Sequence, residues 1–204
     1  MKRFTALAIT ALLAMCAPPL AAHGEMVQMR IDAKASKVVA VVAEPMKERG
    51  NAEGAFTITS GEISGDPSNP AGTGSLTIVL DASSYDSGNP FRDDAVVGRA
   101  LQCETYPTIT FKSTGLQNIA TTSQTAGTAT VMGDLTLHGT THPLSVPFRA
   151  SLDATKHFVA DGEVTFRYAD FGVKVLSMLG SALLAGEEVT VRFHIVAVPI
   201  AAGG

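Results

Sequence analysis

The chain has 204 residues, of which 46% are hydrophobic and 17% charged, and its formal net charge is −4. That length accommodates one domain with a substantial core. The acidic balance and the absence of a basic cluster argue against nucleic acid or an anionic membrane surface as a partner.

The chain begins with the layout of a secretory signal peptide. Lys2 and Arg3 precede an apolar run over residues 4–15, and small residues follow. This run is too short to span a bilayer, which takes ~20 apolar residues. We expect residues 1–22 to be a signal peptide and residues 23–204 to form one exported domain in the periplasm.

The two cysteines bear on how the exported chain is held. A lipid anchor on Cys16 is an alternative to cleavage after residue 22, but Met15 stands where that processing prefers a small residue. We therefore do not expect anchoring. Cleavage leaves Cys103 as the one remaining cysteine, which excludes an internal disulfide and favours a buried thiol.

Apolar and polar residues alternate along most of the remaining chain, as in strands that have one buried face. Short connections rich in Gly, Pro, Asn and Asp join these segments. Parallel strands would need longer crossovers, so the pattern favours an all-β antiparallel barrel or sandwich. The nine candidate strands cover residues 27–31, 38–43, 56–59, 76–81, 109–111, 131–138, 144–152, 158–168 and 189–197.

Two segments depart from this alternation and predict short helices. In residues 84–106, apolar residues recur at helical intervals after Asp93 or Asp94, and either aspartate is a candidate N-cap. In residues 173–188, leucines recur at similar intervals. The second helix is either a lid over the barrel or an element packed on its end.

His138 and His142 flank a predicted hairpin turn at Gly139-Thr140-Thr141. A His-x3-His pair holds a metal when both residues lie on one face of a helix, whereas this segment is predicted to be extended. Zinc sites take three or four ligands, and no cysteine or carboxylate cluster lies nearby in sequence. We interpret the pair as polar residues beside a turn and expect no metal.

The sequence contains no motif typical of an enzyme. Gly-x-Ser-x-Gly, His-Glu-x-x-His, phosphate-binding glycine loops and Cys-x-x-Cys are all absent. By strand parity His138 and His194 are predicted to face outward, and His157 falls in a turn. We expect no catalytic residue and no cofactor.

Six stretches resemble the YceI-like family of exported bacterial proteins, and they occur in the family's order. They are GAFTITSGEISGDP (54–67), LTIVLDASSYDSGNPFRDDAV (76–96), YPTITFKST (106–114), GDLTLHGTTHPL (133–144), ADFGV (169–173) and GEEVTVRF (186–193). The resemblance implies a lipocalin-like antiparallel barrel of about eight strands with one or two short helices. It also implies an apolar cavity that binds polyisoprenoids or similar long amphipathic lipids.

Two positions depart from the family's pattern. Many members carry Lys where this chain has His142, and Arg where it has Tyr168, two residues before the Asp of the Asp-Phe-Gly motif. Arg167 lies one residue earlier, on the opposite face of the predicted strand, so it does not inherit a role in holding a ligand head group.

Because the resemblance implies a cavity, the residues on the apolar faces of the predicted strands are candidates for its lining. The alternative is that these side chains fill a solid core. Arg92 and Asp93 are candidates for meeting a head group at the mouth, or else they form a structural ion pair or helix cap. The candidate lining residues are Phe56, Ile78, Leu80, Ile109, Phe111, Val131, Leu135, Leu137, Phe148, Val164, Phe166, Val191 and Phe193.

The resulting functional hypothesis is an exported, non-catalytic binding protein for an isoprenoid or other long-chain lipid, acting in transport or storage. The alternative is a stress-response or interaction module whose barrel is solid and whose loops engage a protein partner. An enzyme or metal protein that uses His138 and His142 is a third reading.

Overall fold

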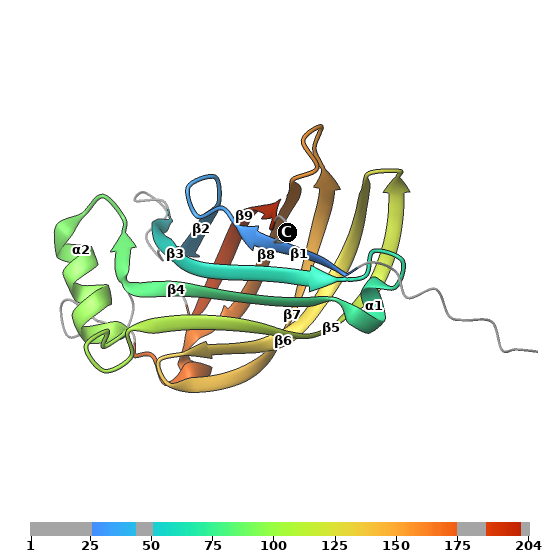
Figure 1. Cartoon of the computed structure of the whole chain (residues 1–204). Helices are drawn as coiled ribbons and strands as arrows, with labels where there is room; N and C mark the ends of the chain where they lie inside the picture. The colour runs from blue at the N-terminus through green and yellow to red at the C-terminus, as the bar shows by residue number, and fades with distance from the viewer. Residues whose placement is uncertain (1–25, 44–50, 175–186, 201–204) are drawn as a thin grey trace, which may run out of the picture.

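The computed structural model describes residues 26–43, 51–174 and 187–200 (Figure 1). The expected signal peptide, Cys16 and nearly all of the expected helix over residues 173–188 lie outside the described residues. Within the described part, no helix is both long enough and apolar enough to cross a membrane.

Nine antiparallel strands form one sheet that closes into a barrel, which confirms the predicted fold class and all nine predicted strands. The order is β1-β3-β2-β9-β8-β7-β6-β5-β4, and pairing of β3 with β4 closes it. The strands are β1 (Val27–Ile31), β2 (Lys37–Val42), β3 (Ala52–Gly65), β4 (Ser75–Asp86), β5 (Thr108–Ser123), β6 (Ala126–Leu137), β7 (Thr140–Leu152), β8 (Phe158–Arg167) and β9 (Glu188–Pro199).

β1 and β2 together occupy one place in the barrel, so nine strands fill eight positions. Both pair with β3 on one side and β9 on the other, β1 beside Pro199 and β2 beside His194. The interruption between them is bridged by Ser36, whose Oγ accepts from the Val196 N–H (2.9 Å) and donates to the Val196 carbonyl (3.3 Å).

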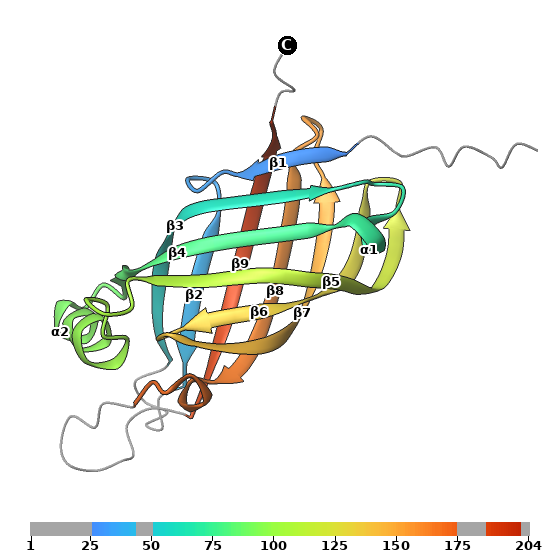
Figure 2. The same cartoon turned by 60° about the horizontal axis from the view of Figure 1, so that its bottom comes forward.

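Short helical elements mark the two ends of the barrel (Figures 1 and 2). At one end, here the helical end, lie α2 (Pro90–Asp94), the π-helix η1 (Ala95–Ala100) and the 3-10 turn η2 (Tyr168–Phe171). At the other, here the hairpin end, lie α1 (Pro70–Thr73) and the β5–β6 and β7–β8 turns. The two ends therefore differ in the elements that border them, three helical elements at one end and a short helix with two hairpin turns at the other.

The helix predicted to follow Asp93 or Asp94 begins earlier, at Pro90. Asn89 is the N-cap, and its side chain accepts hydrogen bonds from the Phe91 and Arg92 amides. Proline suits the next position because the first helical N–H has no intrahelical partner. Asp94 does precede η1, as one of the two predicted caps, but it is already helical and its side chain makes no capping hydrogen bond. The capping hydrogen bonds come from Asn89, because an Asn-Pro pair outside the apolar pattern starts the helical segment.

The β6–β7 turn also differs from its prediction. β6 ends at Leu137 and β7 begins at Thr140, so the turn consists of His138 (φ 51°) and Gly139 (φ 72°) instead of Gly139-Thr140-Thr141. Two successive residues with positive φ match the right-handed twist of a tight hairpin. His138 is thus a turn residue and does not lie on a strand face.

Candidate functional site

The interior of the barrel is a cavity of about 1250 Å³. All nine strands contribute side chains to its wall, and the lining reaches from Arg92 at the helical end to Lys156 at the hairpin end. Close-packed protein cores contain few voids larger than a water molecule. The barrel is therefore hollow, which contradicts the alternative of a solid core.

The side chains predicted to line a cavity do line it. Several of them, including Phe111 and Phe193, stay only half-buried, because their inner surfaces face the cavity instead of another side chain. Their role in binding a ligand stays a prediction. The thirteen are Phe56, Ile78, Leu80, Ile109, Phe111, Val131, Leu135, Leu137, Phe148, Val164, Phe166, Val191 and Phe193.

Two inward-facing glycines explain how large aromatic rings leave the cavity open. A Cβ on Gly133 would lie 2.4 Å from Cζ of Phe111, and one on Gly162 would lie 2.5 Å from Cζ of Phe193. Each ring therefore lies against the backbone of the neighbouring strand, along the wall. A side chain at either glycine would push the ring toward the centre of the barrel.

The structure separates the two residues predicted at the mouth. Arg92 lines the helical end of the cavity with Tyr85, where burial raises the pKa of the tyrosine while the Arg92 charge opposes the rise. Asp93 is not part of the lining. Its Oδ1 accepts hydrogen bonds from the Ser87 amide (3.0 Å) and hydroxyl (2.6 Å), which holds the loop before α2.

The departures from the family's pattern near η2 have a clear geometry. Arg167 is exposed and pairs with Glu187 at 2.9 Å, whereas Tyr168 is buried and lines the cavity. Burial raises the pKa of the Tyr168 phenol, which keeps it neutral. An uncharged tyrosine therefore lines the wall at the position where the family resemblance implies an arginine.

His142 fastens η2 to the barrel. Its Nε2 donates to the carbonyl of Asp170 (3.0 Å), and its ring meets Phe171 edge-on with centroids 5.1 Å apart. Phe171 in turn packs edge-on against Phe166 of the cavity wall, at 5.2 Å. The second histidine of the pair is thus a positioning residue for a turn at the helical end.

His138 was predicted to face solvent, and this was wrong. Its ring packs on Tyr106 with centroids 4.4 Å apart, and its Nε2 is buried without a hydrogen-bond partner among the described residues. The turn conformation carries the side chain off the strand face that parity assigned to it. His194 remains exposed and pairs with Asp161 at 2.7 Å.

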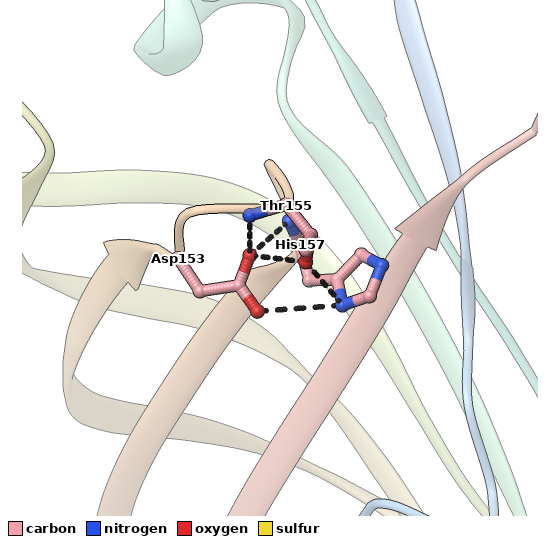
Figure 3. Close-up of polar contacts among 3 residues, drawn as sticks. All are labelled: Asp153, Thr155 and His157. Atoms are coloured by element: carbon pink, nitrogen blue, oxygen red, sulfur yellow. Dashed lines mark hydrogen bonds and ion pairs between the residues drawn. The ribbon is translucent and has the colours of Figure 1, made fainter.

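Asp153, Thr155 and His157 gather in the β7–β8 turn (Figure 3). Oγ1 of Thr155 (3.0 Å) and Oδ2 of Asp153 (3.3 Å) both approach Nδ1 of His157. A nucleophile–base–acid relay needs one partner on each ring nitrogen. Because both partners meet the same nitrogen, the cluster is a turn scaffold.

Polar residues at the hairpin end were missed by the sequence reading. Lys156 and the β5–β6 turn contribute to the lining there, although they lie in loops outside every alternating segment. Asp153 marks a turn in the sequence, but residue spacing does not show that this turn lies beside the cavity. The polar lining residues at the hairpin end include Ser64, Asp66, Ser75, Ser123, Gln124, Thr125, Ser151 and Lys156.

The other chemically active groups do not form a site in the described residues. Cys103 is buried, and burial raises the pKa of its thiol with a smaller contribution from the Asp81 carboxylate. No three or more His, Cys, Asp or Glu side chains of the described ranges converge as metal ligands. The cavity is therefore the candidate functional site.

Comparison with known proteins places this barrel in a family. The model of the YceI-like domain matches residues 29–197, which is most of the chain. The chain belongs to the YceI-like family. Among curated relatives of this YceI-like chain are a UPF0312 protein of Vibrio vulnificus (strain YJ016), 35% identical over 95 residues, and one of Vibrio cholerae (strain M66-2), 36% identical over 95 residues.

Each of these alignments covers 46% of this chain and 47% of the relative, so the chain spans about half the length of the curated relatives it matches. Solved structures of other proteins align over more of it. BcnA of Burkholderia cenocepacia is 28% identical with a TM-score of 0.68 and covers 82% of this chain and 99% of its own.

A structure described as a polyisoprenoid binding domain from Saccharophagus degradans has a TM-score of 0.66 at 14% identity. It covers 86% of this chain and 100% of its own. At that identity the likeness shows the fold alone.

Proposed function

We propose that this YceI-like protein is an exported binding protein that holds an isoprenoid or other long-chain amphipathic lipid in its barrel. The observation that carries the proposal is the cavity of about 1250 Å³ with its apolar wall. The signal-peptide pattern supports a periplasmic location, and the chemistry is binding for transport or storage without a catalytic step.

The size of the cavity suits a long tail. At ~30 Å³ per water molecule, it encloses the volume of roughly forty waters. A methylene group takes up about as much space as a water molecule, so a tail of some tens of carbons fits. Water filling such a space would meet mostly apolar side chains, which offer it few hydrogen bonds.

The energetics also favour a long tail. Each methylene removed from water contributes ~0.8 kcal/mol, so eight buried carbons give about 6 kcal/mol before the cost of ordering the chain. Micromolar affinity corresponds to about 8 kcal/mol net. Because ordering the tail offsets part of the gain, tight binding takes more than eight carbons.

The family supports the isoprenoid class. One structural neighbour is described as a polyisoprenoid binding domain, and its fold is that of this chain. The alternative from another class, an interaction module with a solid core, does not fit the hollow barrel.

Native mass spectrometry of the purified protein, followed by lipid extraction, tests the proposal directly. We expect co-purified lipid with an apolar tail. Protein that emerges empty, and that fails to take up farnesol when it is supplied, would refute lipid binding.

The same assay on a variant tests where the lipid lies. Phe111→Asp places a carboxylate on the cavity wall and should reduce lipid retention at least about tenfold, because burying an unpaired charge beside a tail is costly. Thr110→Asp is the matched control, since Thr110 precedes Phe111 on β5 and does not line the cavity. Equal retention in both variants would place the lipid elsewhere.

A further inference from the structure

The strands β7 and β8 pair along only part of their length. Residues 148–152 of β7 pair with residues 158–162 of β8. Nearer the helical end, residues 140–147 and 163–167 continue as strands but do not pair with each other. Each of these two segments is held on one side only, the first by β6 and the second by β9. The place where they face each other without a backbone ladder is called the open seam below.

Prolines explain why the ladder stops. The Asp153 amide donates to the His157 carbonyl (3.0 Å) across the β7–β8 turn. In an antiparallel strand, every second residue before Asp153 then directs its backbone groups toward β8. Pro147 and Pro143 lie at two of these positions. Proline has no N–H to donate, so the edge of β7 at the open seam lacks two of the donors that a ladder would need.

The open seam borders the cavity directly. Leu144 and Val146 on β7 line the cavity, as do Val164 and Phe166 on β8. Elsewhere in the wall, paired backbones close the space between neighbouring strands. Because no ladder joins the two segments of the open seam, only side chains close the wall between them.

η2 fills the helical end of the open seam, beside the end of β8 (Figure 2). On the β7 side, Nε2 of His142 donates to the Asp170 carbonyl (3.0 Å), and its ring meets Phe171 at a centroid distance of 5.1 Å. On the β8 side, Phe171 meets Phe166 at 5.2 Å. Phe171 is only 2% exposed, so one buried ring bridges the two unpaired segments.

These contacts can separate while the rest of the barrel stays intact. Moving η2 away from β7 breaks the hydrogen bond of His142 and its contact with Phe171, whereas the β6–β7 and β8–β9 ladders are unaffected. His142, Asp170 and Phe171 do not line the cavity. Their separation would therefore open the wall without removing contacts from a lipid inside.

We propose that the open seam is a side entry for the lipid tail and that η2 is its gate, held shut by His142 and Phe171. This inference rests on the proposed function and adds the route by which the lipid reaches the cavity. A long tail crosses the wall sideways over a short distance, whereas entry through an end requires it to travel along the barrel. The gate sets the rates of uptake and release together and leaves Kd unchanged, because both directions pass through the same open state.

A reversible cross-link tests the gate. A variant that combines His142→Cys with Phe171→Cys ties η2 to β7 when it is oxidised, and dithiothreitol releases η2 in the same protein. We expect the oxidised form to take up and release farnesyl anthranilate, a fluorescent ester of farnesol, at least about tenfold more slowly than the reduced form, as for closure of a lid. Stopped-flow fluorescence measures both rates, and equilibrium titration should give the same Kd. Peptide mapping by mass spectrometry establishes the cross-link.

The matched control is a cross-link between Thr165→Cys and Thr190→Cys. The two hydroxyls lie 2.8 Å apart on β8 and β9, which a ladder already joins, so this cross-link should change neither rate. Unchanged rates in the oxidised His142→Cys/Phe171→Cys protein would show that the lipid enters elsewhere and would overturn the inference. The same holds if both cross-links slow the rates equally, since the effect would then not belong to the open seam.

His142→Phe tests the gate without a cross-link and decides the matter if the double variant does not fold or oxidise. It keeps a ring against Phe171 and removes the hydrogen bond to Asp170, so uptake and release should both accelerate roughly three- to tenfold at unchanged Kd. Circular dichroism and thermal melting establish that the variant is folded. A change in release alone would make η2 part of the lipid-binding surface and would overturn the gate. Failure of the wild-type protein to bind either the ester or farnesol refutes the proposed function itself.

Discussion

Asp153 is the residue that organises the β7–β8 turn. Thr155 and His157 supply its hydrogen bonds, and the pKa of its carboxyl is lowered, chiefly by the hydroxyl of Thr155 and then by the His157 amide. Hydrogen bonds to the ionised form favour that form. A single carboxylate thus sets the conformation of a turn that carries Lys156.

Because the folded-state pKa of Asp153 lies below its unfolded value, its contribution to stability is fully present above about pH 4, the ordinary aspartate range. The contribution is lost as the pH falls through the lowered pKa. We expect Asp153→Asn to reduce the free energy of unfolding at pH 6 and to matter less at pH 2–3. Urea titrations at both pH values measure this difference.

An equal effect of Asp153→Asn at both pH values would contradict the role of the charged form. A carboxyl titration of Asp153 by nuclear magnetic resonance provides the control, because it reports the lowered pKa directly. In the wild-type protein, the titration midpoint of the Asp153 carboxyl resonance should lie at a lower pH than the midpoints of exposed carboxyls that accept no hydrogen bonds.

The barrel depends, at the scale of its elements, on how β1 and β2 share one position. The gap between them interrupts the ladder with β9, and Ser36 restores it through two hydrogen bonds to Val196. A backbone N–H without a partner in a partly buried site is costly. The side chain of Ser36 therefore substitutes for a missing strand residue.

Ser36→Ala should lower the free energy of unfolding by about 1–2 kcal/mol, because it leaves the Val196 N–H without its acceptor. Chemical denaturation measures this change. Ser60→Ala is a suitable control, since Ser60 is exposed on β3 and its hydroxyl makes no hydrogen bond with the residues described. A loss as small as that of the control would show that the gap is tolerated without Ser36.

At the scale of the whole molecule, the described strands form a closed sheet around the cavity. No large side chain of the described residues is completely buried, because the inner face of each strand borders the cavity. A barrel of this kind lacks the packing contacts that fill an ordinary core. Its stability should therefore depend on what occupies the cavity.

A bound lipid should raise the melting temperature. At a free ligand concentration about 100 times Kd, binding to the native state adds ~2.7 kcal/mol. For a chain of this size that corresponds to roughly 5–10 °C. Calorimetry of delipidated protein with and without farnesol measures the shift, and glycerol at the same concentration is the control. No shift at saturating farnesol would contradict binding inside the barrel.

The alternation of apolar and polar residues was sufficient to predict the strands and the thirteen candidate side chains that line the cavity. Phe111 and Leu135 face inward because a period of two leaves no other choice once one face is apolar. Parity failed at His138, where a two-residue turn rotates the side chain away from the face its position suggests. Parity also could not predict that Arg92 lines the cavity whereas its neighbour Asp93 does not. The carboxylate of Asp93 instead accepts a hydrogen bond from Ser87.

The sequence by itself determined that the chain forms antiparallel strands with one apolar face, because the alternation of apolar and polar residues is set by residue order alone. Only the tertiary structure decided that the interior is hollow and that Lys156 and the β5–β6 turn share one rim. Those features depend on barrel closure, on rings lying against Gly133 and Gly162, and on turns brought together from distant segments. Local spacing carries no information about the diameter of a closed sheet or about which loops meet at its ends.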